Sequence, residues 1–261
     1  MPEIISDDGV SLNYVVRGPG SIGVIYLHSL GGNNATWEKF WDQLDVPCYC
    51  HVGLDFRGHG GSTREVCELT NERLSRDVLT LADALGLERF IVVGHSLGGK
   101  VGMKLAALAP ERVRGLVLIG SPGPGLVPFR REDVAELMAT YHDLDVTEAF
   151  FRPWFVVRPN LGIDAWMRSF AALPDWALRV YAEISIWTDI TAEVRGITTP
   201  MLIIAGDDDP VYGPAYQREA VLFAFPHAQF VTIPRCGHGL ILEQPTEIAG
   251  HCAKFFSDNQ L

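Results

Sequence analysis

Short apolar segments rich in β-branched residues alternate along this chain with stretches in which apolar residues recur at helical spacing. One segment, Val24-Ile25-Tyr26-Leu27, is continuously apolar, which is typical of a strand buried on both faces of a parallel sheet. Helical spacing fills residues 71–85, residues 98–109 and the region from Pro245 towards Phe256. This alternation predicts an α/β fold with a doubly wound, mostly parallel sheet. The expected strands are residues 12–17, 24–27, 49–54, 90–93, 113–119, 201–205 and 229–233.

Residues 122–195 interrupt the alternation, because their pattern is helical and irregular and contains no convincing buried strand. An insertion between two sheet strands is naturally placed over the carboxyl ends of the strands, where open α/β sheets bind ligands. We therefore predict a core of residues 1–121 and 196–261 and a helical cap (lid) of residues 122–195. The cap holds four of the six tryptophans, Trp154, Trp166, Trp176 and Trp187. Aromatic side chains of the cap serve either its own small core or a substrate pocket, and Trp154 and Trp187 are our candidates for the pocket.

Composition and charge argue against several classes of partner. The formal charge is −11, from 21 Lys and Arg against 32 Asp and Glu, which disfavours binding to a phosphate backbone. No apolar run reaches the roughly 18 residues of a membrane span, and the first residues lack a secretory signal pattern. We therefore expect a cytoplasmic protein with no nucleic-acid or membrane partner. No pattern predicts the oligomeric state.

The five cysteines are odd in number and show no C-x-x-C pairing. Cys48, Cys50 and His51 resemble a metal cluster locally, but neighbouring residues of an extended segment point to opposite faces. We therefore predict buried free thiols and no metal site.

The segment Gly94-His95-Ser96-Leu97-Gly98 is a G-x-S-x-G pattern placed directly between a predicted strand and a predicted helix. Such a turn forces its serine into a strained backbone conformation, and a β-carbon at either glycine would collide with the neighbouring chain. The serine hydroxyl then stands clear of the sheet at a helix N-terminus, where developing negative charge is favoured. This context predicts that Ser96 is a nucleophile.

A nucleophilic serine needs a base, and the base needs an acid that orients it. In this architecture the expected order is Ser, then Asp or Glu, then His, each on a loop after a strand. The strand at 201–205 is followed by Asp207, Asp208 and Asp209, and the strand at 229–233 is followed by His238. Glycines flank His238, so that it lies in a loop and not on an apolar face.

At this point the chain resembles the α/β-hydrolase superfamily over essentially its whole length. Within that superfamily its motifs and its cap are most similar to those of small capped serine hydrolases, namely enol-lactone hydrolases, haloperoxidase-like esterases and carboxylesterases. The resemblance is carried by residues 27–32, 55–62, 94–99 and 206–210, by Gly237-His238 and by Glu243-Gln244-Pro245.

The resemblance implies a role for each motif residue. It implies Ser96 as nucleophile, His238 as base and Asp209, which stands before Pro210, as acid, with Asp208 as the alternative. It also implies an oxyanion hole formed by the backbone N–H groups of Leu97 and Leu30. The family usually has His-Gly after the first central strand, whereas this chain has His28-Ser29, so Ser29 becomes a candidate side-chain contributor. No organic cofactor is required for such chemistry.

The predicted function is hydrolysis of an ester or lactone of a small, largely apolar substrate through an acyl-enzyme. A cap arginine that faced Ser96 would favour a substrate with a carboxylate; the candidates are Arg130, Arg131, Arg152, Arg158, Arg168 and Arg179. One alternative is a carbon–carbon bond hydrolase of a ring-cleavage product, although such enzymes usually place an aromatic residue where this chain has Gly239. The other is a small-molecule receptor on a hydrolase fold.

Overall fold

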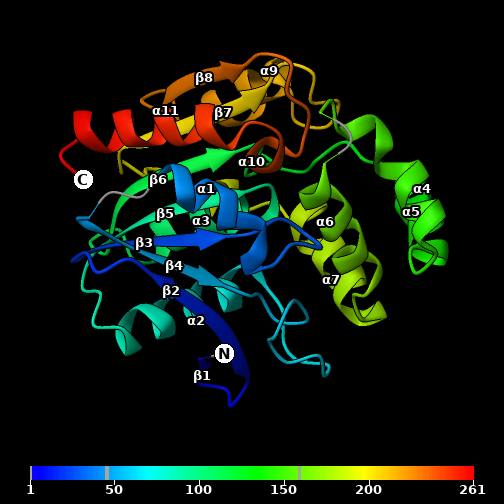
Figure 1. Cartoon of the computed structure of the whole chain (residues 1–261), viewed down its shortest axis with the longest axis horizontal. Coiled ribbons are helices and arrows are strands. Elements are labelled where there is room, and N and C mark those ends of the chain that lie inside the picture. Colours follow the sequence, from blue (N-terminus) through cyan, green and yellow to red (C-terminus); the bar gives the residue numbers. More distant parts are fainter. Residues whose placement is uncertain (1, 45–46, 158–159) are drawn as a thin grey trace.

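The computed structural model describes residues 2–44, 47–157 and 160–261, and a sheet of eight strands forms its centre (Figure 1). The first two pairs of neighbouring strands are antiparallel, and each later pair is parallel. The prediction of an α/β fold with a mostly parallel sheet is therefore confirmed. In spatial order the strands are β1 (Glu3–Ile5), β2 (Ser11–Arg17), β4 (Tyr49–Leu54), β3 (Ile22–Leu27), β5 (Phe90–His95), β6 (Val113–Ile119), β7 (Met201–Gly206) and β8 (Gln229–Ile233).

Helices and helical turns fill the intervals between the strands. Those of the core are α1 (Glu38–Gln43), α2 (Asn71–Ala84), α3 (Leu97–Leu108), α9 (Pro214–Tyr216), α10 (Leu240–Glu243), α11 (Pro245–Asp258), η1 (Asn34–Trp37) and η3 (Gln217–Leu222). Those of the insertion are α4 (Arg131–Thr140), α5 (Leu144–Phe151), η2 (Arg152–Trp154), α6 (Leu161–Ala171), α7 (Asp175–Ile186) and α8 (Thr191–Val194). In the described part of the chain no helix has both the length and the hydropathy that a membrane span needs.

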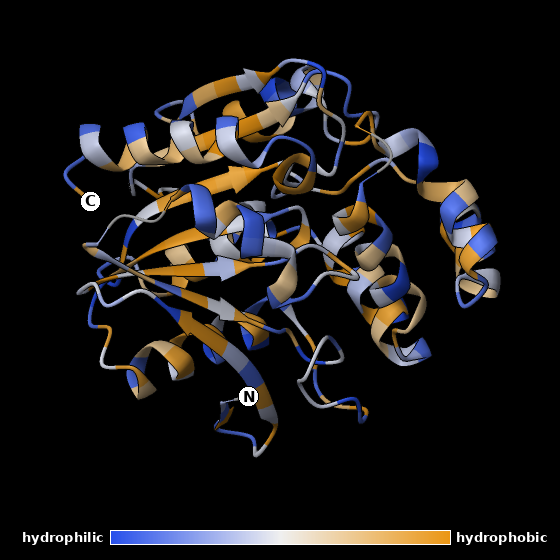
Figure 2. Ribbon diagram, in the orientation of Figure 1, coloured by the Kyte–Doolittle hydropathy of each residue, from blue (hydrophilic) through white to orange (hydrophobic). Residues whose placement is uncertain are grey.

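Both faces of the sheet are buried, because alternate side chains of the continuously apolar strands point in opposite directions. In β3, Val24 and Tyr26 join the apolar cluster of α1 and α11. The intervening Ile25 and the following Leu27 join the cluster of α2 and α3. Figure 2 shows the result as apolar strands in the interior and helices with one polar face.

The insertion between β6 and β7 is helical, and its described residues 122–157 and 160–195 form no strand. Figure 1 shows α6 and α7 beyond the carboxyl ends of the central strands, with α4 and α5 further from the sheet. The helices therefore lie at the edge of the sheet where the catalytic loops are expected.

Lys100 holds the two ends of the insertion to the core. Its side chain is fully buried on α3. The ammonium group donates to the carbonyl oxygens of Gly125, Ser185 and Thr188 at 3.2, 3.1 and 2.6 Å. Gly125 precedes α4, whereas Ser185 lies in the last turn of α7 and Thr188 follows that helix. One cation therefore joins the segment that leaves the core to the segment that returns to it. Burial lowers the pKa of Lys100 to about 8.

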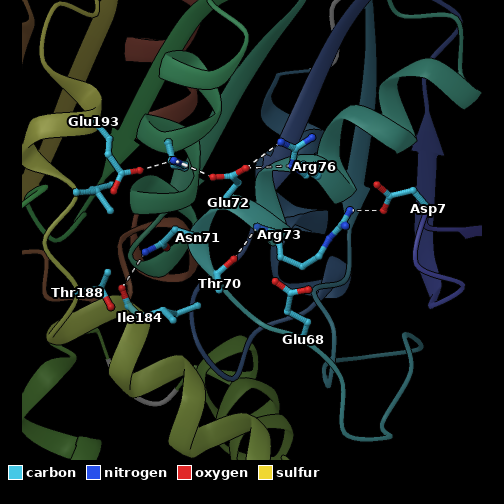
Figure 3. Close-up of a pocket in the computed structure, with 12 residues that line it drawn as sticks. Asp7, Glu68, Thr70, Asn71, Glu72, Arg73, Arg76, Ile184, Thr188 and Glu193 are labelled. Carbon is cyan, nitrogen blue, oxygen red and sulfur yellow. Dashed lines mark hydrogen bonds and ion pairs between the residues drawn. The ribbon is translucent and has the colours of Figure 1, made fainter.

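A polar cavity of about 670 Å³ lies beside this junction, between α2, α3 and the last residues of the insertion (Figure 3). Its charged groups pair with one another across the two parts of the chain. Lys104 binds both Glu193 and Glu72, and Arg76 also binds Glu72. We therefore interpret this cavity as part of the contact between insertion and core.

The cysteines differ in part from the prediction of buried free thiols. All five are free, but Cys48 is exposed, and Cys50 and Cys67 are half-buried. Cys236 and Cys252 are the buried pair. Cys48 is exposed because it precedes β4 and does not belong to that buried strand.

Candidate active site

Ser96 lies in the sharp turn between β5 and α3. Its φ and ψ are 52° and −121°, a conformation that costs a non-glycine residue about 1–3 kcal/mol. The turn is held by hydrogen bonds from Ser96 N–H to Ile119 O and from Gly99 N–H to Ser96 O. A β-carbon at Gly98 would lie 2.1 Å from Leu27 O, so the strand and the turn can approach this closely only at a glycine. The strained turn predicted for this pattern is present.

The structure brings Ser96, His238 and Asp209 together, although His238 is 142 residues from Ser96 in the chain. His238 Nε2 lies 3.2 Å from Ser96 Oγ, and Nδ1 lies 2.9 Å from Asp209 Oδ2. All three side chains are buried, with 6–8% of each residue exposed. The imidazole therefore bridges a hydroxyl and a carboxylate in the arrangement that nucleophilic serine catalysis requires.

The Asp209 carboxylate is fixed by its own loop. Its Oδ1 accepts from the N–H groups of Val211 and Tyr212 at 2.8 and 3.0 Å, which leaves Oδ2 for His238. Burial acts to raise the pKa of Asp209, but the neighbouring His238 and the two N–H groups lower it below its ordinary value. Asp208 is exposed, and the structure does not bring its side chain to His238.

His95 binds the backbone of the loop that carries His238, which is called the histidine loop below. Its Nε2 lies 2.9 Å from His238 O, so this nitrogen carries a proton and donates a hydrogen bond to the carbonyl oxygen. Burial lowers the pKa of His95 to about 3, which keeps the ring neutral. His95 thus holds the backbone of the base in place without adding charge to the site.

The loop after β3 is braced by two neutral histidines. Phe56 N–H donates to Nε2 of His28, so Nδ1 carries the proton and donates to Ser29 O. Gly31 N–H donates to Nε2 of His59 at 3.1 Å. Burial lowers the pKa of both imidazoles. The backbone that carries the N–H of Leu30 is therefore held rigidly.

Ser29 and Leu30 line the cavity that also contains Ser96 and His238. Trp166 donates from its indole N–H to Ser29 Oγ at 3.2 Å and to Leu30 O at 3.1 Å. The Trp166 contact uses a lone pair of Ser29, so the hydroxyl proton of Ser29 can still be donated. Leu97 begins α3, and its N–H is one of the first-turn groups that have no acceptor within a helix.

The cavity at Ser96 has a volume of about 300 Å³ and is mostly apolar. Of the two tryptophans predicted to line a substrate pocket, Trp154 lines this cavity. Trp187 is not among the described residues of the lining; its indole N–H donates to Phe129 O, and Arg131 lies over its ring. The side chains that line the cavity come mainly from the insertion: Phe129, Val134, Leu137, Phe150, Phe151, Trp154, Trp166, Phe170, Leu178, Ala182, Ser185 and Ile186.

No Lys, Arg, Asp or Glu occurs among the described residues that line this cavity. The candidate cap arginines in the described part of the chain are all exposed: Arg130, Arg131, Arg152, Arg168 and Arg179. Arg158 lies outside the described residues. In the described part of the lining, no lysine or arginine is therefore present to pair with a bound carboxylate.

Residues 24–251 match the alpha/beta hydrolase family. The chain belongs to this family. A hydrolase from Pseudomonas aeruginosa has a similar structure, with a TM-score of 0.86 and 28% identity over 98% of this chain and 97% of that one. The fold and the hydrolase family are therefore established for this protein.

Curated relatives of this alpha/beta hydrolase have several activities. The pimeloyl-[acyl-carrier protein] methyl ester esterase of Nitrosomonas europaea is 30% identical over 86% of this chain and 91% of its own length. The 2-hydroxy-6-oxononadienedioate/2-hydroxy-6-oxononatrienedioate hydrolase of Paraburkholderia phymatum is 28% identical over 87% of this chain and 84% of its own length. The dihydrolipoyllysine-residue acetyltransferase component of the acetoin cleaving system of Cupriavidus necator is 36% identical, but over 45% of this chain and 31% of its own length.

Two residues of this alpha/beta hydrolase make contacts at the site that the sequence did not predict. Trp166 holds Ser29, and Glu243 binds the loop of His238. Trp166 belongs to the aromatic set of the insertion, and Glu243 to the Glu-Gln-Pro motif, but neither pattern indicates the partner that each side chain contacts.

Proposed function

We propose that this alpha/beta hydrolase cleaves esters or lactones of small, neutral, largely apolar substrates. The observation that carries the proposal is the chain of hydrogen bonds from Ser96 through His238 to Asp209 at the wall of an apolar cavity. Ser96 serves as nucleophile, His238 as general base and acid, and Asp209 as the group that orients the imidazole and stabilises its cation.

The reaction has two steps. Ser96 Oγ attacks the substrate carbonyl while its proton passes to Nε2 of His238, and the imidazolium then gives this proton to the leaving alkoxide. Water, deprotonated by the same nitrogen, next attacks the acyl-enzyme and releases the acid and the serine. In each step the N–H groups of Leu97 and Leu30 stabilise the tetrahedral oxyanion, a contribution of about 3–4 kcal/mol for each donor.

In this proposal residues 122–195 act as a cap that supplies most of the substrate contacts. Twelve of the described lining residues come from this segment, and their side chains are apolar apart from the hydroxyl of Ser185 and the indole N–H groups of Trp154 and Trp166. Such a lining favours alkyl or aryl groups, because burying an unpaired carboxylate costs several kcal/mol. A small-molecule ester or lactone is accordingly the partner that we propose.

Hydrolysis of a carbon–carbon bond in a ring-cleavage product is the second candidate function, and the similarity to the 2-hydroxy-6-oxononadienedioate/2-hydroxy-6-oxononatrienedioate hydrolase favours it. The substrates in its name are dienedioates and trienedioates, which carry carboxylates. The described lining of this cavity offers no lysine or arginine to pair with them, which favours neutral esters.

A pair of substrates of equal chain length tests the proposal. We expect kcat/KM for p-nitrophenyl hexanoate to exceed that for the mono-p-nitrophenyl ester of adipic acid by about tenfold or more, since the second substrate buries a terminal carboxylate. Steady-state rates at neutral pH measure both values. A higher value for the adipate ester would contradict the neutral-substrate proposal, and no turnover of any ester or lactone would contradict ester hydrolysis.

Ser29→Ala tests the side-chain contribution to the oxyanion hole. We expect kcat to fall about tenfold with little change in KM, because a donor that acts on the oxyanion stabilises the transition state more than the bound substrate. Trp166 keeps Leu30 O as an acceptor in this variant, so the loop retains one of its contacts. An unchanged kcat would assign the hydroxyl to packing alone.

A further inference from the structure

Glu243 ends α10, and its buried carboxylate lies between the loop of His238 and the insertion. Oε1 accepts from the N–H of Gly239, the residue after the proposed base, at 3.1 Å. Oε2 accepts from the N–H groups of Val156 and Val157 at 2.8 and 2.9 Å. One side chain therefore joins the histidine loop to the insertion segment that follows η2.

Two further hydrogen bonds join the insertion to the histidine loop and to α10. His238 N–H donates to Trp154 O at 2.6 Å, and the side-chain amide of Asn160 donates to Leu242 O at 2.7 Å. A β-carbon at Gly237 would lie 2.3 Å from Trp154 O, so this approach requires a glycine. The backbone of the proposed base thus lies directly against the insertion.

Trp154 connects this contact to the substrate cavity. Its ring lines the cavity and stands edge-on to the His238 imidazole, with 5.4 Å between the ring centroids. A shift of the segment that carries Trp154 would therefore move the loop of His238 as well. The carboxylate of Glu243 opposes such a shift with three charge-assisted hydrogen bonds, which are stronger than neutral ones.

We propose that Glu243 is a positioning residue, which keeps the His238 imidazole aligned between Asp209 and Ser96 by tethering its loop to the insertion. The proposal rests on the proposed function, because it takes His238 as the base. Glu243 is not among the described residues that line the cavity, so it acts through His238 and not on the substrate. A merely structural carboxylate would change the fraction of folded enzyme but not the turnover of each folded molecule.

Glu243→Gln tests the proposal, with Glu247→Gln as the matched control. The glutamine keeps one acceptor oxygen, but its NH₂ group opposes the N–H donors that the second oxygen now binds. Glu247 is exposed on α11, four residues further along the chain. The measurements are kcat and KM for p-nitrophenyl hexanoate, with active sites counted by fluorophosphonate titration.

For Glu243→Gln we expect kcat per titrated site to fall about 10-fold to 100-fold, because small misplacements of a catalytic group cost rates of this order. KM should change less than about twofold, and Glu247→Gln should keep both values within about twofold. A fall in kcat per titrated site of less than about fivefold overturns the proposal, even when fewer sites titrate, and so does a rise in KM alone.

If Glu243→Gln does not fold, Glu243→Asp decides, because it keeps the charge and withdraws the carboxylate by one methylene group. A loss of about fivefold or more in kcat per titrated site then supports the proposal, and a smaller loss overturns it. A wild-type enzyme that hydrolyses no ester would instead refute the proposed function itself. The two failures are therefore distinct.

Discussion

Ser96→Ala should lower kcat/KM for p-nitrophenyl hexanoate by at least about 10⁴-fold, because it removes the nucleophile that forms the acyl-enzyme. Replacing the hydroxyl by hydrogen leaves the backbone contacts of the turn in place, namely those with Ile119 O and Gly99 N–H. The variant should therefore fold and unfold like the wild type. Steady-state kinetics and a thermal unfolding curve measure the two properties separately.

Ser121→Ala is the matched control for this loss. Ser121 is fully buried and donates to Pro122 O, but it is not among the described residues that line the cavity. Its replacement should leave kcat/KM within about threefold of the wild type. If Ser96→Ala retained more than about 1% of wild-type activity, ester hydrolysis would proceed without the serine and the mechanism would be wrong.

The turn around Ser96 could be predicted because its requirements are local. Gly94 is needed where β5 and α3 approach each other, because its β-carbon would meet Gly98 and Gly99, only a few residues further along the chain. The requirement at Gly98 is different, since its β-carbon would meet Leu27 of β3, and there the G-x-S-x-G pattern predicted the glycine without showing its partner. The central buried strands could be predicted for a similar reason, since runs of four or five consecutive apolar residues, such as residues 90–93 and 201–205, are visible without knowing their neighbours. β1, with three residues, is too short to show a period and was not predicted.

The insertion marks the limit of such prediction. Trp154 and Trp187 belong to the same aromatic-rich segment, but packing decides which of them reaches the cavity. Trp154 is held by the loop of His238, whereas Trp187 packs beneath Arg131 at the end of α7. Helical periodicity does not contain these tertiary contacts. The same is true of Glu243, whose partner Val156 lies 87 residues earlier in the chain.

Asp209→Asn should lower kcat by about 10⁴-fold with little change in KM or stability. Oδ1 of this side chain accepts from the N–H groups of Val211 and Tyr212, so the asparagine must keep its carbonyl oxygen there. Its NH₂ group then faces Nδ1 of His238, which favours the tautomer with a proton on Nε2. That nitrogen can no longer accept the proton of Ser96, and the positive charge that develops on the imidazole is no longer stabilised.

Asp208→Asn is the matched control, since the same substitution is made one residue earlier on an exposed side chain. The chain order of strand, acid and base allows either aspartate, and the difference between them lies in direction: Asp209 turns inward to His238, whereas Asp208 faces solvent. We therefore expect Asp208→Asn to keep kcat within about threefold of the wild type. If kcat fell further in Asp208→Asn than in Asp209→Asn, the role of the acid that orients His238 would have to be assigned to Asp208. It would also require the loop after β7 to change its course when substrate binds, since Asp208 N–H now donates to Cys236 O on the loop that precedes His238.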